Sequence, residues 1–258
     1  MTRQLCCHVV PAARRSTFHV RRLGKGEGLK RPTKAPSVVA NRVFLGYPWQ
    51  PYKTMWENHV ADLHKRYPLH FLAIGREPGQ AATQLLTNIM RGLDTSSMAL
   101  FDASTGNANV SLEYGYFRAA RGEENGFLFI DEDAKIATGQ TPIISDLAGA
   151  VANRYKPTDN RLRHALDAIC DRHPYVKRFT KFCGQRRYKG GTRKFLVRMI
   201  RHFDGRESIL RRELLDDLIH ETKKPEAYLL KFLRELHAAG LITITRGNEF
   251  SSRVHVSG

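Results

Sequence analysis

Short apolar runs alternate with amphipathic segments between residues 41 and 130, and this alternation restricts the fold more than any other feature of the chain. The runs at 41–47, 69–74, 98–101 and 126–130 suit buried strands, while residues 52–67 and 81–93 repeat apolar side chains at helical spacing. Residues 143–153 add a last strand or a short helix. Because strand–helix units repeated in this order pair their strands in parallel, we expect an α/β fold with an open parallel sheet flanked by helices.

The segment 97–122 joins the third strand to the next helix. The strand ends at Asp102, and a polar turn over 104–107 leads into a helix that Asn109 caps, with Glu113 in its first turn. Because open α/β sheets bind ligands at the carboxyl edge of their strands, Asp102 and Glu113 form a candidate reactive site. Each also has an ordinary structural role, since Asp after a strand forms turns and the helix dipole favours Glu in a first turn.

Charge is distributed unevenly along the 258 residues. The chain carries +17 in total, with +8 over residues 1–38, −3 over 39–150 and +12 over 151–258. Residues 1–38 show no sustained periodicity, and we interpret them as a basic, disordered tail. The positive C-terminal part predicts a nucleic-acid partner, with a merely solvated basic surface as the alternative.

The sequence lacks the common motifs of metal-binding, phosphate-binding, dinucleotide-binding and serine-hydrolase sites. The four cysteines have no zinc-binding spacing, and the histidines form no HExxH pattern. Phosphate-binding loops, dinucleotide-binding fingerprints and GxSxG motifs do not occur. We therefore expect no metal and no cofactor. Sparse cysteines and the lack of an apolar run of about 20 residues predict a cytoplasmic protein without membrane contact.

The chain beyond residue 155 has a different pattern. The α/β domain is expected over 39–155 and a helical linker over 156–190. A second domain is expected over 191–258, with helices at 192–203, 208–219 and 223–239 and short strands at 241–245 and 253–256. Three helices and a β-hairpin predict a winged helix-turn-helix. We expect it to bind nucleic acid through the start of its third helix and through its wing, at Lys223, Lys224, Tyr228, Lys231, Arg246 and Arg253. Protein binding by this domain is the alternative.

Residues 97–122 resemble the core motif of the nucleoside 2-deoxyribosyltransferase-like family and the related TIR-like family. That motif runs from an Asp at a strand end, through a Pro/Asn-Asn-Val segment, to a Glu followed by Leu-Gly-Tyr-Ala at the start of a helix. The matching residues are Asp102, Asn107, Asn109, Val110, Glu113, Gly115 and Tyr116. The strand at 44–48 also resembles the family's first strand, so the resemblance spans about residues 41–150. Tyr114 and Phe117 depart from the family pattern, which has leucine and a small residue there.

The resemblance implies a site that cleaves an N-glycosidic bond. Glu113 would attack the anomeric carbon or stabilise an oxocarbenium-like transition state, and Asp102 would hold a sugar hydroxyl or assist the leaving base. Substrate would be bound by Tyr47, Gly46, Asn109 and Asn107. The implied substrate is NAD, a nucleotide or a nucleoside, and the implied assembly is a homo-oligomer or an effector complex.

Three functions follow from these expectations. In the first, the chain is an N-glycosidase effector controlled by its winged helix, and the pairing of the two domains is similar to retron-type anti-phage effectors. In the second, it is a DNA-binding transcriptional regulator whose α/β domain senses a nucleotide without cleaving it. The third, a nucleoside salvage transferase, is less favoured because such an enzyme rarely needs a basic second domain.

Overall fold

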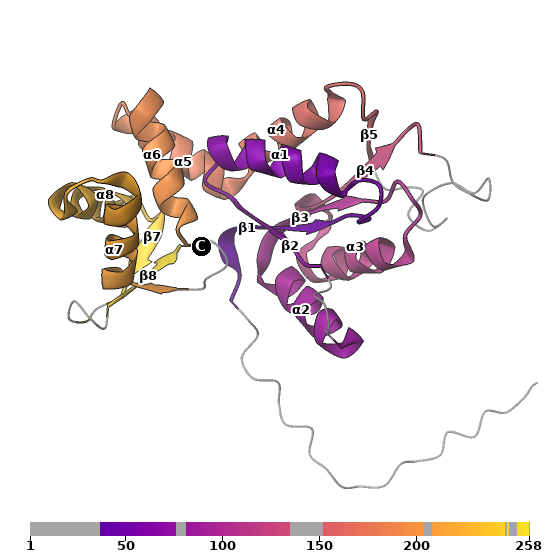
Figure 1. Cartoon of the computed structure of the whole chain (residues 1–258), viewed down its shortest axis with the longest axis horizontal. Coiled ribbons are helices and arrows are strands. Elements are labelled where there is room, and N and C mark those ends of the chain that lie inside the picture. The colour runs from indigo at the N-terminus through magenta and orange to yellow at the C-terminus, as the bar shows by residue number, and fades with distance from the viewer. Residues whose placement is uncertain are drawn as a thin grey trace, which may run out of the picture. The chain divides into compact units, whose positions relative to one another are not determined.

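A five-stranded parallel sheet forms the centre of the α/β part (Figure 1). The computed structural model describes residues 37–75, 81–134, 152–203, 208–245, 247 and 252–257. The strand order is β2-β1-β3-β4-β5, and every pairing is parallel. The strands are β1 (Val39–Gly46), β2 (His70–Ala73), β3 (Ser96–Asp102), β4 (Gly126–Asp131) and β5 (Ala152–Tyr155). The predicted α/β fold with a parallel sheet is therefore confirmed.

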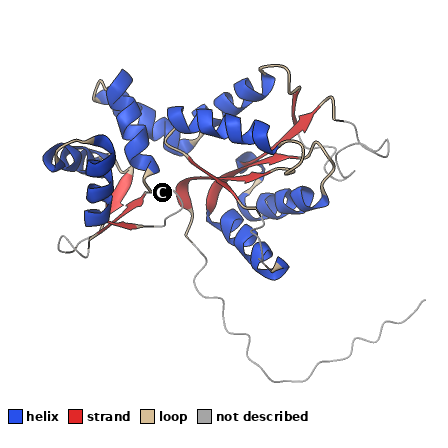
Figure 2. Ribbon diagram, in the orientation of Figure 1, coloured by secondary structure: helices blue, strands red, loops and turns tan. Residues whose placement is uncertain are grey.

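Helices cover both faces of this sheet, as Figure 2 shows. Helices α1 (Lys53–Arg66) and α4 (Arg161–Arg172) pack on one face, and α2 (Ala82–Thr95) and α3 (Ala108–Arg121) pack on the other. A short 3-10 turn, η1 (Glu123–Asn125), joins α3 to β4. Alternate strand residues supply the two cores: Val43 and Leu45 face α1, while Phe44 faces α2 and α3. Burying each such side chain contributes about 1.5–3 kcal/mol.

The start of α3 differs from the sequence expectation. Asn107, and not Asn109, caps the helix, because its side-chain oxygen accepts a hydrogen bond from the Asn109 backbone N–H at 2.9 Å. Since α3 begins at Ala108, Glu113 lies in the second helical turn and not in the first. Tyr114 and Phe117 are both buried against Phe101 of β3, so aromatic rings hold this helix on the sheet.

The expected helical linker forms two helices, α4 and α5 (Pro174–Gln185). Helix α4 belongs to the core on the sheet, with Leu162 and Leu166 buried there. Helix α5 contributes Phe179 and Phe182 to the core of the C-terminal part. The buried Tyr175 hydroxyl donates to the Leu241 carbonyl oxygen at 3.0 Å. These helices are therefore packed parts of the fold as well as connections.

Three helices and a small antiparallel sheet follow α5. The elements are α6 (Gly190–Arg201), β6 (Ile209–Leu210), α7 (Arg211–Thr222), α8 (Glu226–Ala238), β7 (Ile242–Ile244) and β8 (Arg253–Val256). The strand order is β6-β8-β7. Helix α8 begins three residues later than expected, because Lys223 ends α7 in the left-handed conformation, with φ of 56°, and Pro225 precedes the first turn of α8.

Some expectations concern residues outside those that the structure describes. These are the disordered tail, of which all but residues 37–38 lies outside, the part of the last strand before residue 152, and Arg246 in the expected wing. Among the described helices, none has the length and apolar character needed to cross a bilayer.

Candidate active site

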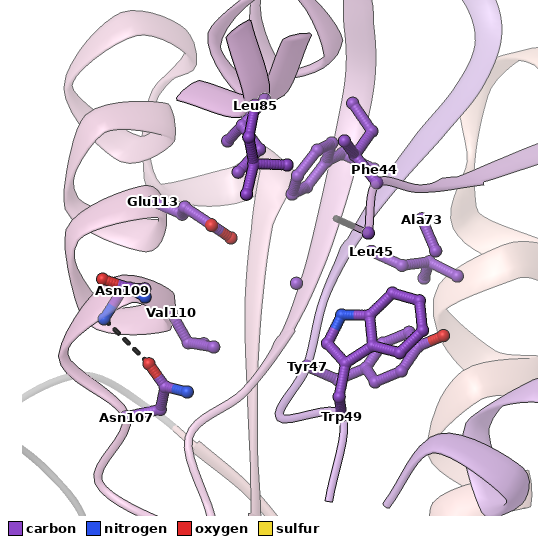
Figure 3. A pocket seen from close by; sticks show the side chains of 14 residues that line it. Phe44, Leu45, Tyr47, Trp49, Ala73, Leu85, Asn107, Asn109, Val110 and Glu113 are labelled. Atoms are coloured by element: carbon purple, nitrogen blue, oxygen red, sulfur yellow. Dashed lines mark hydrogen bonds between the residues drawn. The ribbon is translucent and has the colours of Figure 1, made fainter. Parts of the chain in front are cut away.

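A pocket opens at the carboxyl edge of the sheet, where the connections from β1 and β3 leave in opposite directions. In sheets of this order, that switch point is where ligands bind. The pocket has a volume of about 390 Å³, a size that suits a small ligand. Figure 3 shows Glu113 and Asn109 on one side and Tyr47 and Trp49 on the other. The lining residues are Phe44, Leu45, Gly46, Tyr47, Trp49, Ala73, Ile74, Gly75, Leu85, Ile89, Asn107, Asn109, Val110 and Glu113.

Glu113 is the acidic group among these lining residues. Burial raises the pKa of its carboxyl to about 7, because an ionised carboxylate loses hydration in these apolar surroundings. It makes no hydrogen bond or ion pair with any residue that the structure describes. A carboxyl group of this kind changes its protonation state near neutral pH, so it is available for acid, base or nucleophilic chemistry.

Gly46 allows the Glu113 carboxylate to approach the end of β1. A Cβ atom at position 46 would lie 2.9 Å from Glu113 Oε2 and 2.6 Å from Phe101 Cδ1. Both distances are too short for non-bonded contacts with carbon, so a larger residue would displace either the carboxylate or the ring. The lack of a side chain at Gly46 therefore leaves room for the Glu113 carboxylate in the pocket.

Two aromatic side chains form the opposite side of the pocket. Tyr47 is half-buried and Trp49 is 46% exposed, and their rings stack with centroids 6.5 Å apart. The Trp49 ring lies against the backbone after β2, where a Cβ atom at Gly75 would come within 1.8 Å of it. The Lys53 ammonium sits 4.5 Å from the Trp49 ring centroid. This side of the pocket presents flat apolar surface, which suits a planar heterocycle.

Asp102 lies behind the pocket and not in it. Its side chain is completely buried, and its Oδ2 accepts hydrogen bonds from Trp56 Nε1 and from the Tyr155 hydroxyl, each at 2.7 Å. Its Oδ1 accepts from the Ser104 backbone N–H at 3.0 Å and from the Ser104 hydroxyl. Burial raises the pKa of Asp102, and these hydrogen bonds oppose the shift. The expectation that Asp102 holds a sugar hydroxyl is not met, because protein donors occupy both of its oxygens.

The structure therefore brings together five of the six residues expected at the reactive site. Glu113, Gly46, Tyr47, Asn107 and Asn109 line one pocket, and Asp102 lies beneath it. Trp49 lines the pocket as well, and it was not among the residues predicted for the site. The available signal was its position just after the first strand, beside Tyr47 and Pro48.

The described residues among those expected to bind nucleic acid lie in the turn between α7 and α8, on α8 and on β8. Lys223 and Lys224 form the exposed turn between α7 and α8, and the Lys224 ammonium lies 5.7 Å from the Tyr228 ring centroid. Lys231 is exposed on α8, with its ammonium near Phe232. Arg253 on β8 is exposed and donates to the Ser208 hydroxyl at 3.0 Å. Since α8 begins at Glu226, the two lysines precede the third helix and do not form its first turn.

Comparisons with known proteins assign no family. Neither a family model nor a curated protein matches the chain. In the part of the chain that the structure describes, no cluster of three or more His, Cys, Asp or Glu side chains is placed to hold a metal ion. The function is therefore argued from the pocket and its chemistry.

Proposed function

We propose that the chain is an effector that cleaves an N-glycosidic bond of NAD, a nucleotide or a nucleoside, with Glu113 as the catalytic carboxylate. The observation that carries the proposal is the position of Glu113, half-buried at the carboxyl edge of the sheet and facing an aromatic surface across a pocket. Cleavage of such a bond needs a carboxylate beside the anomeric carbon and a place for a planar base. The pocket offers both.

The ionised Glu113 carboxylate either attacks the anomeric carbon or stabilises its developing positive charge. The base departs with the electron pair of the C–N bond. Water then supplies a hydroxyl group to the anomeric carbon; where Glu113 has bonded to that carbon, this step breaks the carbon–carboxylate bond and restores the ionised carboxylate. The remaining proton of the water passes to the departing base or to solvent. Asn109 and Asn107, at the start of α3, are positioned to bind the sugar hydroxyls. Tyr47 and Trp49 contact the base.

We further propose that the C-terminal part is a winged helix that binds nucleic acid or a protein partner and thereby controls the site. The element order α6-β6-α7-α8-β7-β8, with β8 between β6 and β7, supports this assignment. The charge of +12 over residues 151–258 supports a polyanionic partner. Control of this kind suits an anti-phage effector, whose activity must be restrained until infection.

The assembly and location proposed for the chain rest on smaller observations. We propose a homo-oligomer or an effector complex, and in either assembly the exposed Leu86 and Leu112, on α2 and α3, are apolar side chains that a contact would cover. Cys170 and Cys183 are free, buried thiols, which supports a reducing compartment such as the cytoplasm.

Base release from NAD and from a panel of purine and pyrimidine nucleosides tests the proposal, with the Glu113→Gln variant alongside. We expect the variant to lose at least about 10³-fold in rate while its circular dichroism spectrum stays unchanged, because glutamine neither attacks carbon nor carries charge. Glu124→Gln, which alters an exposed glutamate beyond the same helix, is the matched control. A Glu113→Gln variant as active as the wild type would overturn the assignment.

The pH dependence of base release identifies the active form of Glu113. Since the carboxyl has a pKa of about 7 and the proposal needs it ionised, the rate should rise between pH 6 and pH 8 and then level off. A rate that falls across this interval would instead indicate a general acid.

The runner-up function is a transcriptional regulator whose pocket binds a nucleotide without cleaving it. The basic C-terminal part, with its three helices and antiparallel sheet, favours this alternative. It predicts sequence-selective duplex binding that changes when the pocket is filled, and no base release from any substrate of the panel.

A further inference from the structure

Three stacked aromatic rings connect the pocket to the interior of the α/β part. Tyr47 lies between two tryptophans, with its ring centroid 6.5 Å from that of Trp49 and 5.9 Å from that of Trp56. The Tyr47 and Trp56 rings are nearly parallel, with 12° between their planes. Trp56 is buried and contacts Phe129 edge-on. The aromatic side of the pocket is therefore supported from below by Trp56.

Trp56 is in turn held by Asp102. The indole has a single N–H group, and that group donates to Asp102 Oδ2 at 2.7 Å. Asp102 cannot shift easily, because Tyr155 and Ser104 donate to it from other directions. A hydrogen bond to a fixed, buried carboxylate sets the orientation of the whole indole plane. The orientation of Trp56 then determines the plane on which Tyr47 rests.

We infer that Asp102 is a positioning residue that acts through Trp56 and Tyr47 to align the exposed ring of Trp49 for stacking against the planar base of the substrate. This inference rests on the proposed function. It gives Asp102 a role in substrate affinity without contact with substrate, and it assigns the stacking surface of the base subsite to Trp49, with Tyr47 as its support. Glu113, on α3 and across the pocket, performs its chemistry independently of this stack.

A double-variant cycle on Asp102 and Trp56 tests the inference. Asp102→Asn replaces the carboxylate with an amide, whose NH2 group cannot accept the hydrogen bonds that the surrounding residues donate. Trp56→Phe removes the indole N–H but keeps an aromatic ring. Each variant should raise the KM for the cleaved substrate about tenfold, as expected for loss of one charge-assisted hydrogen bond. The double variant should raise it no further than either single variant, because both remove the same contact. Values of kcat, and the pH profile that Glu113 sets, should stay unchanged.

Tyr116→Phe is the matched control. The Tyr116 hydroxyl donates to Asp94 Oδ1 at 2.8 Å, so this variant breaks another hydrogen bond between a tyrosine and an aspartate, on the opposite face of the sheet from Trp56. Its KM should stay within about twofold of the wild type. If Tyr116→Phe and Asp102→Asn raise the KM equally, Asp102 contributes only to general stability and the inference is overturned. Additive effects in the double variant, or a changed pH profile, would also overturn the inference.

A fluorescence measurement tests the positioning without any catalysis. Trp49 and Trp56 are the two tryptophans of the chain, so Trp49→Phe leaves Trp56 as the sole emitter. In that background, Asp102→Asn should raise acrylamide quenching of Trp56 about twofold, because a released indole opens more often to solvent. Tyr116→Phe should leave the quenching unchanged. If the wild type releases no base from any substrate, the proposed function fails and this measurement alone decides the inference; unchanged quenching in Asp102→Asn overturns it.

Discussion

Asp102 and Glu113 both lie at the carboxyl edge of the sheet, in the same stretch of sequence, and yet their surroundings are opposite. Asp102 is enclosed by Trp56, Tyr155 and Ser104, which satisfy both of its oxygens. Glu113 faces a pocket, and no described residue forms a hydrogen bond with its carboxylate. Burial raises the pKa of both groups, but only Asp102 has donors that stabilise its charged form.

This difference separates a carboxylate that maintains structure from one that is available for chemistry. A buried charge with all of its hydrogen bonds formed holds neighbouring elements in place, and removing it leaves several donors unsatisfied. A buried charge without partners destabilises the fold, and proteins retain such groups where the chemistry requires them. The predictions below test this contrast.

The largest expected effect on stability is for Asp102→Ala. The substitution leaves the Trp56 N–H, the Tyr155 hydroxyl and the Ser104 donors buried without an acceptor, and we expect the free energy of unfolding to fall by about 4 kcal/mol. Urea denaturation at pH 7 measures it. Asp133→Ala, which removes an exposed partner of Lys156, should cost no more than about 0.5 kcal/mol. A loss below about 1 kcal/mol at position 102 would contradict the structural role.

Glu113→Gln should have the opposite effect, and only at high pH. The folded-state pKa of about 7 exceeds the ordinary value of 4.5, so the wild type loses stability as pH rises through this interval, by about 3 kcal/mol at pH 8. Glutamine stays neutral, so the variant should match the wild type at pH 4 and be more stable by about that amount at pH 8. Chemical denaturation at the two pH values checks this. Equal stabilities at pH 8 would show that Glu113 is not desolvated.

Gly46→Ala tests how closely β1 and Glu113 approach each other. The added Cβ atom would overlap the Phe101 ring and crowd the Glu113 carboxylate, so we expect a loss of about 2 kcal/mol in stability and a lower rate of base release. Gly115→Ala is the control, because a Cβ atom there meets no atom within 4 Å and alanine favours the helix. In thermal denaturation, the melting temperature of Gly46→Ala should lie below that of the wild type, and that of Gly115→Ala should lie above it. If Gly46→Ala proves as stable as Gly115→Ala, the close approach is disproved.

The smallest effect concerns the C-terminal part, away from both carboxylates. Lys223→Gly with Lys224→Ala should weaken duplex binding about tenfold near 0.1 M salt. The slope of the logarithm of the binding constant against the logarithm of the salt concentration should become shallower, as expected for the loss of about two phosphate contacts. Glycine suits the left-handed conformation at position 223, so the turn is preserved. Fluorescence anisotropy across a salt series measures it, with Lys177→Ala and Lys181→Ala on α5 as the control pair. If both pairs of substitutions weaken duplex binding equally, the duplex binds to a diffuse basic surface and not to the turn between α7 and α8.

Much of the α/β part was predictable because its periodicities are local. The apolar runs and the helical spacing located the sheet, and the strand–turn–helix pattern at 97–122 placed Glu113 at the edge where ligands bind. Boundaries were less well predicted. Asn107 and Asn109 are both good capping residues, and only the hydrogen bond from the Asn109 backbone shows which one caps α3. Lys223 was assigned to a helix because a left-handed turn at a lysine leaves no local signal.

The sequence by itself determined the type of sheet, the edge that carries the site and the presence of a carboxylate there, because each follows from the spacing of neighbouring residues. The tertiary structure decided the surroundings of each carboxylate. Whether Asp102 faces solvent or donors depends on Trp56 and Tyr155, which lie far from it in sequence and reach it only when α1 and β5 have packed. The position of Trp49 against the backbone at Gly75 has the same origin, since β1 and β2 meet only in the folded sheet.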